Sequence, residues 1–409
     1  MQKIYSEKNA LKVLENVRAI LPLSAPPANW STIDWHWEKI CGIPFLIRNI
    51  INIQRAGIDS LTIYSNGDNA DLHKMLCKEK KIKIELTFET DITEVVKLTK
   101  NGSVLILNRN VLYTKQEIES GMRFINQSNL ELVGPNDAHS ITELLTQITL
   151  GEKSSIAQSP DIQGSQINFL SGKNSSNISK PEDFILQQKK LIQGSGLSND
   201  SLMDKTITRF FSHQLTRLFL KTPLSPNMIT ILSLFIGLAS ALFFIQGTHT
   251  NNIIGAALLL LSAWVDCTDG EVARLKFLES KLGGKLDIIC DNLVHFSVFF
   301  AIGLGLYQST GNNFFVLLGT LAVFGSLFSF VLLSNSIINN KEMASANTNY
   351  SKKKNMLTDS MANRDFIYFL FFMSLTGRVD IFIFITAIGS NIFAAYLTYT
   401  KIKSTLHAS

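Results

Sequence analysis

A series of long apolar segments in the C-terminal half constrains this chain more than any other feature. Six segments follow one another from Pro226 onward, and most reach the roughly 20 residues that a helix needs to cross a bilayer. They cover residues 226–246, 252–275, 282–307, 314–338, 366–375 and 380–400. The fifth is the shortest and is bounded by Arg364 and Arg378. We therefore expect an all-α bundle of six transmembrane helices within residues 223–409.

The charges of the connecting loops predict how these segments are oriented. The loops GTHTNN and YQSTGNN contain no Lys or Arg, whereas the alternate loops and the C-terminal tail are basic. Their basic residues are Lys276, Lys281, Lys285, Lys341, Lys352, Lys353, Lys354, Lys401 and Lys403. Because basic loops remain on the cytoplasmic side, we expect a multi-pass protein of the cell (inner) membrane with both termini cytoplasmic. The N-terminus also lacks the pattern of a secretory signal.

The N-terminal part has a different pattern. Short apolar runs such as SLTIYS, IKIELTF and SVLILN alternate with amphipathic stretches such as PFLIRNIINIQRAG. This alternation is typical of a sheet built from βαβ units. We therefore expect a soluble α/β domain over residues 1–150. The net charge of +5 is modest, and the basic residues beside apolar segments account for it, so we do not expect nucleic acid as a partner.

Two further segments connect these parts. Residues 151–181 are rich in Ser, Asn, Gly and Gln, which predicts a flexible linker. Residues 182–222 return to a helical pattern, in which Arg209, His213, Arg217 and Lys221 recur every fourth position beside apolar residues. This pattern predicts interfacial amphipathic helices attracted to anionic headgroups. The alternative is that Arg209 and Arg217, together with Lys285, bind the phosphate of an acceptor substrate.

Four carboxylates stand where the second apolar segment ends and the third begins. Asp266 and Asp269 are three residues apart, and Asp287 and Asp291 are four apart, so each pair shares one helix face. An ionised Asp within a bilayer costs about 2.5–3.5 kcal/mol on insertion scales. Four such acids joined by a short loop therefore imply a hard cation bound between two antiparallel helices. Carboxylate oxygens favour Mg²⁺ or Mn²⁺, and we expect two ions.

Small residues and one arginine extend this pattern. Gly270, Ala273 and Gly283 remove side-chain bulk where a base or diphosphate could approach the backbone, and Arg274 offers a forked cation to phosphate. This combination describes a nucleotide diphosphate site better than a simple ion site. The alternative for the four aspartates is an ion-pair network between helices, but only Arg274 and Lys285 are near them in sequence.

The same residues carry a family resemblance. The pattern Asp266-x2-Asp269-Gly270-x2-Ala273-Arg274-x8-Gly283-x3-Asp287-x3-Asp291 resembles, without a departure, the signature of the CDP-alcohol phosphatidyltransferases. The segment TPLSPNMITILSLFIGL is similar to that family's entry into its first span. The resemblance covers residues 204–403. It implies a six-helix membrane domain, a homodimer, and transfer of a phosphoalcohol group from a CDP-alcohol to an acceptor hydroxyl, with release of CMP, in phospholipid or polar-headgroup synthesis.

The resemblance also implies roles for single residues. Asp266, Asp269, Asp287 and Asp291 would ligate the metals, and Asp291 would also act as general base. The residues implied in binding the CDP part are Asn227, Thr230, Asp266, Asp269, Gly270, Ala273, Arg274 and Gly283. The donor, either CDP-diacylglycerol or a soluble CDP-alcohol, and the alcohol acceptor remain open. The segment DGEVARLKF resembles the corresponding segment of the inositol-phosphate-type members of this family.

The N-terminal part resembles a second family. The segment GIPFLIRNIINIQRAGIDSLTIYSN is similar to a conserved helix and strand of sugar nucleotidyltransferases, which occur fused to some inositol-phosphate-type phosphotransferases. However, AILPLSAPPANW replaces the glycine-rich phosphate loop, and Asn108 and Asn110 occupy the region of the metal-binding aspartate. We therefore expect an inactive domain retained for folding, dimer contacts or positioning. A bifunctional enzyme with an active cytidylyltransferase domain, and a non-catalytic metal-binding channel or transporter, are the alternatives.

Overall fold

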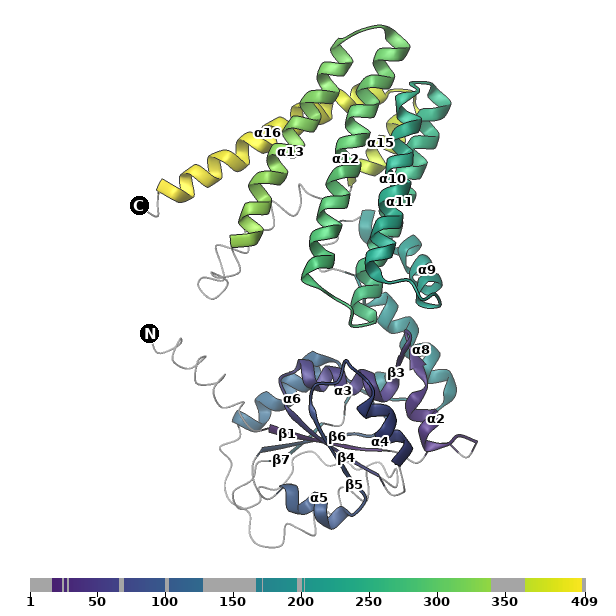
Figure 1. Ribbon diagram of the computed structural model, residues 1–409, viewed down its shortest axis with the longest axis vertical. Coiled ribbons are helices and arrows are strands. Elements are labelled where there is room, and N and C mark those ends of the chain that lie inside the picture. Colours follow the sequence, from purple (N-terminus) through teal and green to yellow (C-terminus); the bar gives the residue numbers. More distant parts are fainter. Residues whose placement is uncertain are drawn as a thin grey trace. The chain divides into compact units, whose positions relative to one another are not determined.

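The computed structural model describes most of the chain in two compact units, Met1–Lys190 and Leu191–Ser409 (Figure 1). The described residues are 17–23, 26–27, 29–65, 70–99, 103–127, 167–170, 172–196, 201, 203–339 and 365–406.

A parallel sheet forms the centre of the N-terminal unit. Its strands are β1 (Val17–Pro22), β4 (Ser60–Tyr64), β5 (Glu85–Glu89), β6 (Ser103–Leu107) and β7 (Ile167–Leu170). They lie in the order β5-β4-β1-β6-β7, and every neighbouring pair is parallel. The chain winds outward from β1 to β5 and returns to β6 on the other side of β1. Such a reversal is where doubly wound sheets form a crevice at the carboxyl ends of their strands.

Helices connect these strands and complete an α/β core. They are α3 (Phe45–Arg55), α4 (Ala70–Cys77), α5 (Ile92–Thr99) and α6 (Lys115–Gln127), with α2 (Thr32–Trp37) preceding α3. Ile20, Val104 and Ile106 from two adjacent strands pack with Val95 of α5 in one buried cluster. Continuous apolar strands of this kind are typical of parallel sheets covered on both faces. The prediction of an N-terminal α/β domain is confirmed.

A small hairpin holds the start of α3 and contains part of the nucleotidyltransferase-like segment. Its strands are β2 (Lys39–Ile40) and β3 (Ile43–Pro44). Cys41 and Gly42 both have positive φ, 51° and 77°, as a two-residue type I′ turn requires. Arg48 Nη2 donates to the Ile40 carbonyl oxygen at 2.9 Å. Burial lowers the pKa of this guanidinium to about 10. Arg48 is therefore one of the groups that fix the hairpin.

The predicted linker differs from the structure. Residues 151–166 lie outside the described part, but β7 lies within the predicted range 151–181 and pairs with β6. The 3₁₀ helix η1 (Asn174–Ser176) and the first residue of α8 (Pro181–Gln193) also lie in this range. The sheet domain therefore extends beyond residue 150. The sequence does not predict β7, because its three apolar residues, Ile167, Phe169 and Leu170, stand in a polar segment.

Within the part of the C-terminal unit that the structure describes, five helices are long and apolar enough to cross a membrane. They are α10 (Pro226–Ile245), α11 (His249–Leu275), α12 (Lys281–Thr310), α13 (Phe314–Asn339) and α16 (Val379–Leu406). The fifth predicted segment forms α15 (Asp365–Leu375), which has only 11 residues. A multi-pass membrane domain is thus supported, whereas the predicted count of six spans is not confirmed.

Close contacts between glycines bring the membrane helices together. A Cβ on Gly305 of α12 would lie 2.0 Å from the Phe244 carbonyl oxygen of α10. A Cβ on Gly303 would lie 3.0 Å from Gly319 Cα of α13. Neither position can take a side chain without moving backbone. Small residues at helix crossings are the usual basis of packing in membranes, where lipid removes the hydrophobic drive between helices.

Helix α9 (Arg209–Leu220) follows the short π-helix η2 (Asp204–Thr208) and differs from the predicted amphipathic helix. Its buried residues include Arg209, Ser212 and Thr216, whereas Phe210 and Leu218 are about 60% exposed. The predicted basic stripe is therefore divided, because Arg209 faces the protein interior. The location of α9 at a membrane surface remains a prediction.

Candidate active site in the membrane domain

The polar ends of α10, α11 and α12 build the candidate site. Each of these helices begins after a hydroxyl residue that caps it: Ser225 accepts from Met228 N, Thr248 from Asn251 N and Ser280 from Gly283 N. Such caps satisfy backbone N–H groups that the first turn leaves open. The short connection Lys276–Ser280 joins α11 to α12. The carboxylates near the end of α11 are thereby brought beside those near the start of α12.

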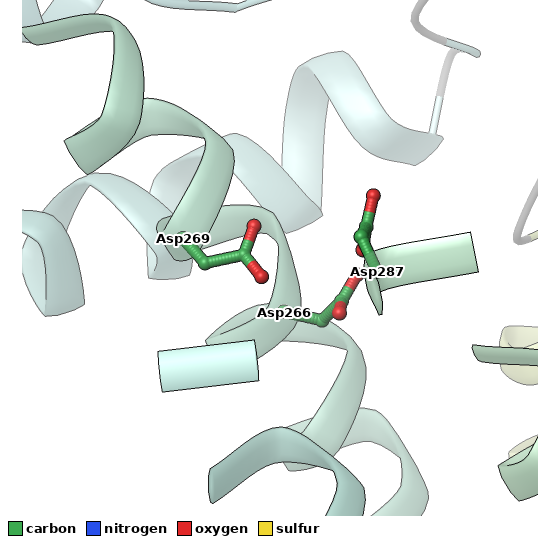
Figure 2. A group of neighbouring side chains, drawn as sticks. All are labelled: Asp266, Asp269 and Asp287. Carbon is green, nitrogen blue, oxygen red and sulfur yellow. The ribbon is translucent and has the colours of Figure 1, made fainter. Parts of the chain in front are cut away.

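Three of the four predicted carboxylates converge. Asp266 and Asp269 of α11 and Asp287 of α12 each offer an oxygen, and these oxygens all lie within 4.8 Å of one another. Figure 2 shows the three carboxyl groups turned toward a common space. Asp266 and Asp269 are buried, and Asp287 is partly buried. An all-oxygen set of this size can hold a hard divalent cation.

Hydroxyl groups of α10 support the two carboxylates of α11. Thr230 Oγ1 donates to Asp269 Oδ2. Ser233 Oγ donates to the Thr230 carbonyl oxygen at 2.7 Å and lies 3.4 Å from Asp266 Oδ1. Hydrogen bonds to outer groups commonly orient metal-binding side chains. The site is therefore assembled from three helices rather than from the two that carry the aspartates.

Asp291 lies beside this group but is not one of the three. It lines a small cavity together with Asp266, Ser233 and His295. The aromatic ring of His295 packs edge-on against Phe366, with centroids 5.0 Å apart. Asp266 therefore belongs both to the group of three carboxylates and to the lining of the cavity that contains Asp291. Metal ligation by Asp291 remains a prediction.

A larger cavity of about 210 Å³ opens on the other side of the carboxylates. Its lining includes seven of the eight residues predicted to bind the nucleotide: Asn227, Thr230, Asp269, Gly270, Ala273, Arg274 and Gly283. Asp266, the eighth, belongs instead to the smaller cavity. Asp287 also lines the larger cavity. The structure thus brings the predicted nucleotide residues together with two of the candidate metal ligands.

The glycines of this cavity keep it open. A Cβ on Gly283 would lie 3.0 Å from Asn227 Oδ1, and a Cβ on Gly270 would lie 3.1 Å from Arg274 Nη1. Both distances are shorter than ordinary contacts, so side chains here would displace cavity-lining groups. Arg274 is anchored, because its Nε donates to the Ser195 carbonyl oxygen at 3.0 Å. The guanidinium therefore lies at a fixed position in the cavity.

The residues predicted to bind an acceptor phosphate do not gather around these cavities. Arg209 is buried against Glu271 of α11 and forms an ion pair with it. Arg217 Nη1 donates to Gln214 Oε1 at 3.1 Å, and Lys285 is exposed. None of these three cations lines either of the two cavities described above.

Sequence reasoning missed Glu271 entirely. It occupies a variable position of the aspartate motif, and its partners lie 55–62 residues earlier in the chain. The available signal was the placement of Arg209, Ser212 and Thr216 on one face of a predicted helix. A row of polar residues buried on one side predicts a polar partner for that side.

Residues 223–400 match the family model described as CDP-alcohol phosphatidyltransferase. The chain is 24% identical over 320 residues to the bifunctional IPC transferase and DIPP synthase of Aquifex aeolicus, covering 66% of this chain and 72% of that protein. It is 36% identical over 101 residues to the archaetidylinositol phosphate synthase of Pyrococcus horikoshii, covering 24% and 52%. A crystal structure of Mycobacterium tuberculosis phosphatidylinositol phosphate synthase with CDP-DAG bound aligns with a TM-score of 0.37 and 17% identity, over 47% of this chain and 93% of that chain.

Proposed function

We propose that residues 223–400, which match the CDP-alcohol phosphatidyltransferase family model, form a CDP-alcohol phosphotransferase that uses an inositol phosphate as its acceptor. Two similar proteins, one archaeal and one bacterial, support this acceptor class, since one is an archaetidylinositol phosphate synthase and the other a bifunctional IPC transferase and DIPP synthase. The reaction moves a phosphoalcohol group from the CDP-alcohol to the acceptor hydroxyl and releases CMP. A CDP-linked lipid alcohol is the donor that a membrane domain fits best.

The observation that carries this proposal is that a group of converging carboxylates adjoins a cavity lined by an arginine and by glycines. Three carboxylate oxygens lie within 4.8 Å of one another, and the adjoining cavity is lined by Arg274 and by the glycines Gly270 and Gly283. Two divalent cations, Mg²⁺ or Mn²⁺, would fit between these carboxylates and a diphosphate. When bound, such ions would neutralise the diphosphate and stabilise the negative charge of the departing CMP.

The residues of the chain would then act as follows. Asp266, Asp269 and Asp287 hold the ions, and Arg274 binds a phosphate oxygen through its fixed guanidinium. Asn227 and the glycine backbones contact the cytidine. The diphosphate would lie between Arg274 and the carboxylates, and this orientation would reduce the entropy that the donor loses on reaching the reactive geometry.

Asp291 is proposed as the general base. The acceptor hydroxyl gives its proton to the Asp291 carboxylate, while the hydroxyl oxygen forms a bond to the β-phosphorus. The bond from that phosphorus to the oxygen bridging the two phosphates breaks, and CMP leaves with this oxygen. The smaller cavity, lined by Asp291 and Asp266, has a volume of about 10 Å³, so only the acceptor hydroxyl would enter it and the rest of the acceptor would lie outside. Positioned base catalysis typically contributes 10²–10⁴-fold.

The direct test measures CMP release by the purified full chain. A CDP-lipid alcohol and an inositol phosphate are supplied with Mg²⁺ or Mn²⁺, and mass spectrometry identifies both products. We expect CMP and a lipid-linked inositol phosphate, both lost in Asp291→Asn while the protein remains folded. Absence of CMP release with any CDP-alcohol would refute the proposal, and ion flux that survives in Asp291→Asn would favour a channel or transporter instead.

A second function is suggested by one relative. The match to a bifunctional protein covers 320 residues and so includes part of the N-terminal unit. We propose that this unit is nevertheless inactive, because Asn108 and Asn110 follow β6 where an active enzyme needs a carboxylate. Turnover of CTP by the full chain, persisting in Asp291→Asn, would contradict this. Cytoplasmic placement of the site at the inner membrane and a homodimer remain parts of the same proposal.

A further inference from the structure

Glu271 forms a second buried carboxylate centre on α11, separate from the group of three. Its side chain has no exposed surface. Oε1 accepts hydrogen bonds from Arg209 Nη1 at 2.6 Å and Ser212 Oγ at 2.7 Å. Oε2 accepts from Thr216 Oγ1 at 2.6 Å. Both oxygens of the carboxylate are therefore held by side chains of α9.

The partners of Glu271 form a single row on α9. Arg209, Ser212 and Thr216 are spaced by three and four residues, which places them on one helix face, and all three are buried. His213 Nε2 lies 3.8 Å from Glu271 Oε1. A buried carboxylate is stable only with a cation and hydrogen-bond donors around it. The α9 row supplies both, and a network satisfied in this way permits one arrangement of the two helices.

A second contact between the same helices lies earlier in α11. Phe211 of α9 stacks on Trp264 of α11, with ring centroids 4.0 Å apart and an interplanar angle of 11°. Trp264 Nε1 donates to Tyr368 Oη at 3.1 Å, and Thr208 Oγ1 lies 2.8 Å from the same oxygen. In the sequence of α11, Trp264 and Glu271 bracket Asp266 and Asp269. The α9 contacts therefore fix α11 on both sides of the carboxylates.

Helix geometry couples the two centres. At about 100° per residue, Glu271 points about 140° away from Asp266 and about 160° away from Asp269 around the axis of α11. Rotating α11 far enough to release Glu271 from Arg209 would turn Asp266 and Asp269 away from Asp287. The position of Glu271 thus determines the rotation of the helix that carries two of the three converging oxygens.

We propose that Glu271 is a positioning residue, whose bonds to Arg209, Ser212 and Thr216 set the rotation of α11 and thereby the cation affinity of the carboxylate group. This inference rests on the proposed function. It assigns no contact between Glu271 and substrate or metal. Outer groups that orient metal-binding side chains typically change metal affinity or activity 10–100-fold when they are altered.

The test measures CMP release by the full chain as a function of Mn²⁺ concentration. In Glu271→Gln, the half-saturating Mn²⁺ concentration should rise about tenfold or more. Arg209→Lys keeps the charge and should stay within about threefold of the unchanged protein, whereas Arg209→Gln should resemble Glu271→Gln. The matched control is Asp380→Asn, which removes another arginine-paired carboxylate of the same unit. That pair, Arg378 Nε to Asp380 Oδ1 at 3.3 Å, is substantially exposed.

The possible results distinguish a positioning role of Glu271 from a role in packing alone. A half-saturating Mn²⁺ concentration unchanged within twofold in Glu271→Gln, with only a lower melting temperature, would overturn the inference. If Glu271→Gln does not fold, Ser212→Ala decides, because it removes one hydrogen bond and leaves the ion pair. We expect it to raise the half-saturating concentration about threefold, and an unchanged value would again overturn the inference. If the unchanged protein releases no CMP, the proposed function fails instead.

Discussion

Polar side chains gather in both units of this protein, but in one unit they form hydrogen bonds to the backbone and in the other they converge on one another. Near the carboxyl end of β6, Asn49 Nδ2 donates to the Val111 carbonyl oxygen and its Oδ1 accepts from Tyr113 N. Asn52 Nδ2 donates to the Tyr113 carbonyl oxygen, and Tyr113 Oη donates to that of Leu170 at 2.6 Å. Burial raises the pKa of this phenol, which keeps it neutral. Each of these side chains thus forms hydrogen bonds to backbone groups and fixes the local chain.

In the membrane unit, three groups of the same negative charge converge instead. Like charges that approach one another raise the free energy of the folded protein unless a cation joins them. Neutral amides that bond to backbone stabilise a fold without any ligand. The convergence of three carboxyl groups therefore supports the proposal that the membrane unit binds a cation, whereas the polar groups at the end of β6 bond to backbone groups of their own domain. The following predictions test this contrast.

The largest effect is expected at Asp287. Asp287→Asn removes one of the three charges available to a cation, so CMP release should fall at least about 1,000-fold while the fold remains. The measurement is the initial rate of CMP release at saturating donor and Mn²⁺. Asp380→Asn, outside both cavities, is the control and should leave the rate unchanged. A loss of less than tenfold in Asp287→Asn would contradict the role of the carboxylates.

A smaller effect is expected where a glycine keeps the cavity open. Gly283→Ala places a Cβ 3.0 Å from Asn227 Oδ1, so KM for the CDP-alcohol should rise about tenfold, on the order of 1.4 kcal/mol. Gly389→Ala is the matched variant, because Gly389 of α16 lines neither cavity and its Cβ would meet nothing within 4 Å. Both changes should favour their helix by a similar amount. Equal KM values for the two variants would mean that the donor does not occupy this cavity.

The hydroxyl of Thr230 should matter less. Thr230→Val removes its hydrogen bond to Asp269, at a cost of about 1 kcal/mol, so half-saturating Mn²⁺ should rise about fivefold. Thr268→Val is the comparison, since Thr268 Oγ1 donates only within α11, to the Trp264 carbonyl oxygen at 2.9 Å. Titration of CMP release with Mn²⁺ distinguishes them. A similar shift in both variants would remove Thr230 from the site.

The smallest effect on activity is expected in the sheet domain. Tyr113→Phe deletes the bond to Leu170 and the one accepted from Asn108 N at 2.7 Å, which should destabilise the domain by about 1–3 kcal/mol. Hydrogen exchange of β6 and β7 should accelerate accordingly. CMP release should stay unchanged. A large loss of CMP release in this variant would mean that the chemistry depends on the internal bonds of the sheet domain.

The sequence predicted the parts of the site that helix periodicity controls. Asp266, Asp269 and Asp287 converge as their spacing on two joined helices requires, and the small residues line one cavity with Arg274. Arg209 was misinterpreted, because a stripe of basic residues does not reveal which of them faces a buried glutamate 62 residues away. Such pairs depend on tertiary packing, which local spacing does not encode.

Among the elements of the fold, the long apolar helices were predicted and the short elements were not. Long apolar runs gave the five long membrane helices, since hydropathy over about 20 residues is a strong signal. The fifth predicted segment became the 11-residue α15, whose apolar stretch alone does not establish a crossing. β7 was missed because a four-residue strand with three apolar residues, within a polar segment, is too short to show a periodicity.

The most direct measurement is anomalous X-ray diffraction from crystals of the full chain grown with Mn²⁺. Our account predicts an anomalous peak at coordination distance, about 2.0–2.3 Å, from carboxylate oxygens of both α11 and α12, with ligands drawn from Asp266, Asp269 and Asp287. A peak bound by carboxylates of one helix alone, or no peak among these residues at saturating Mn²⁺, would contradict it.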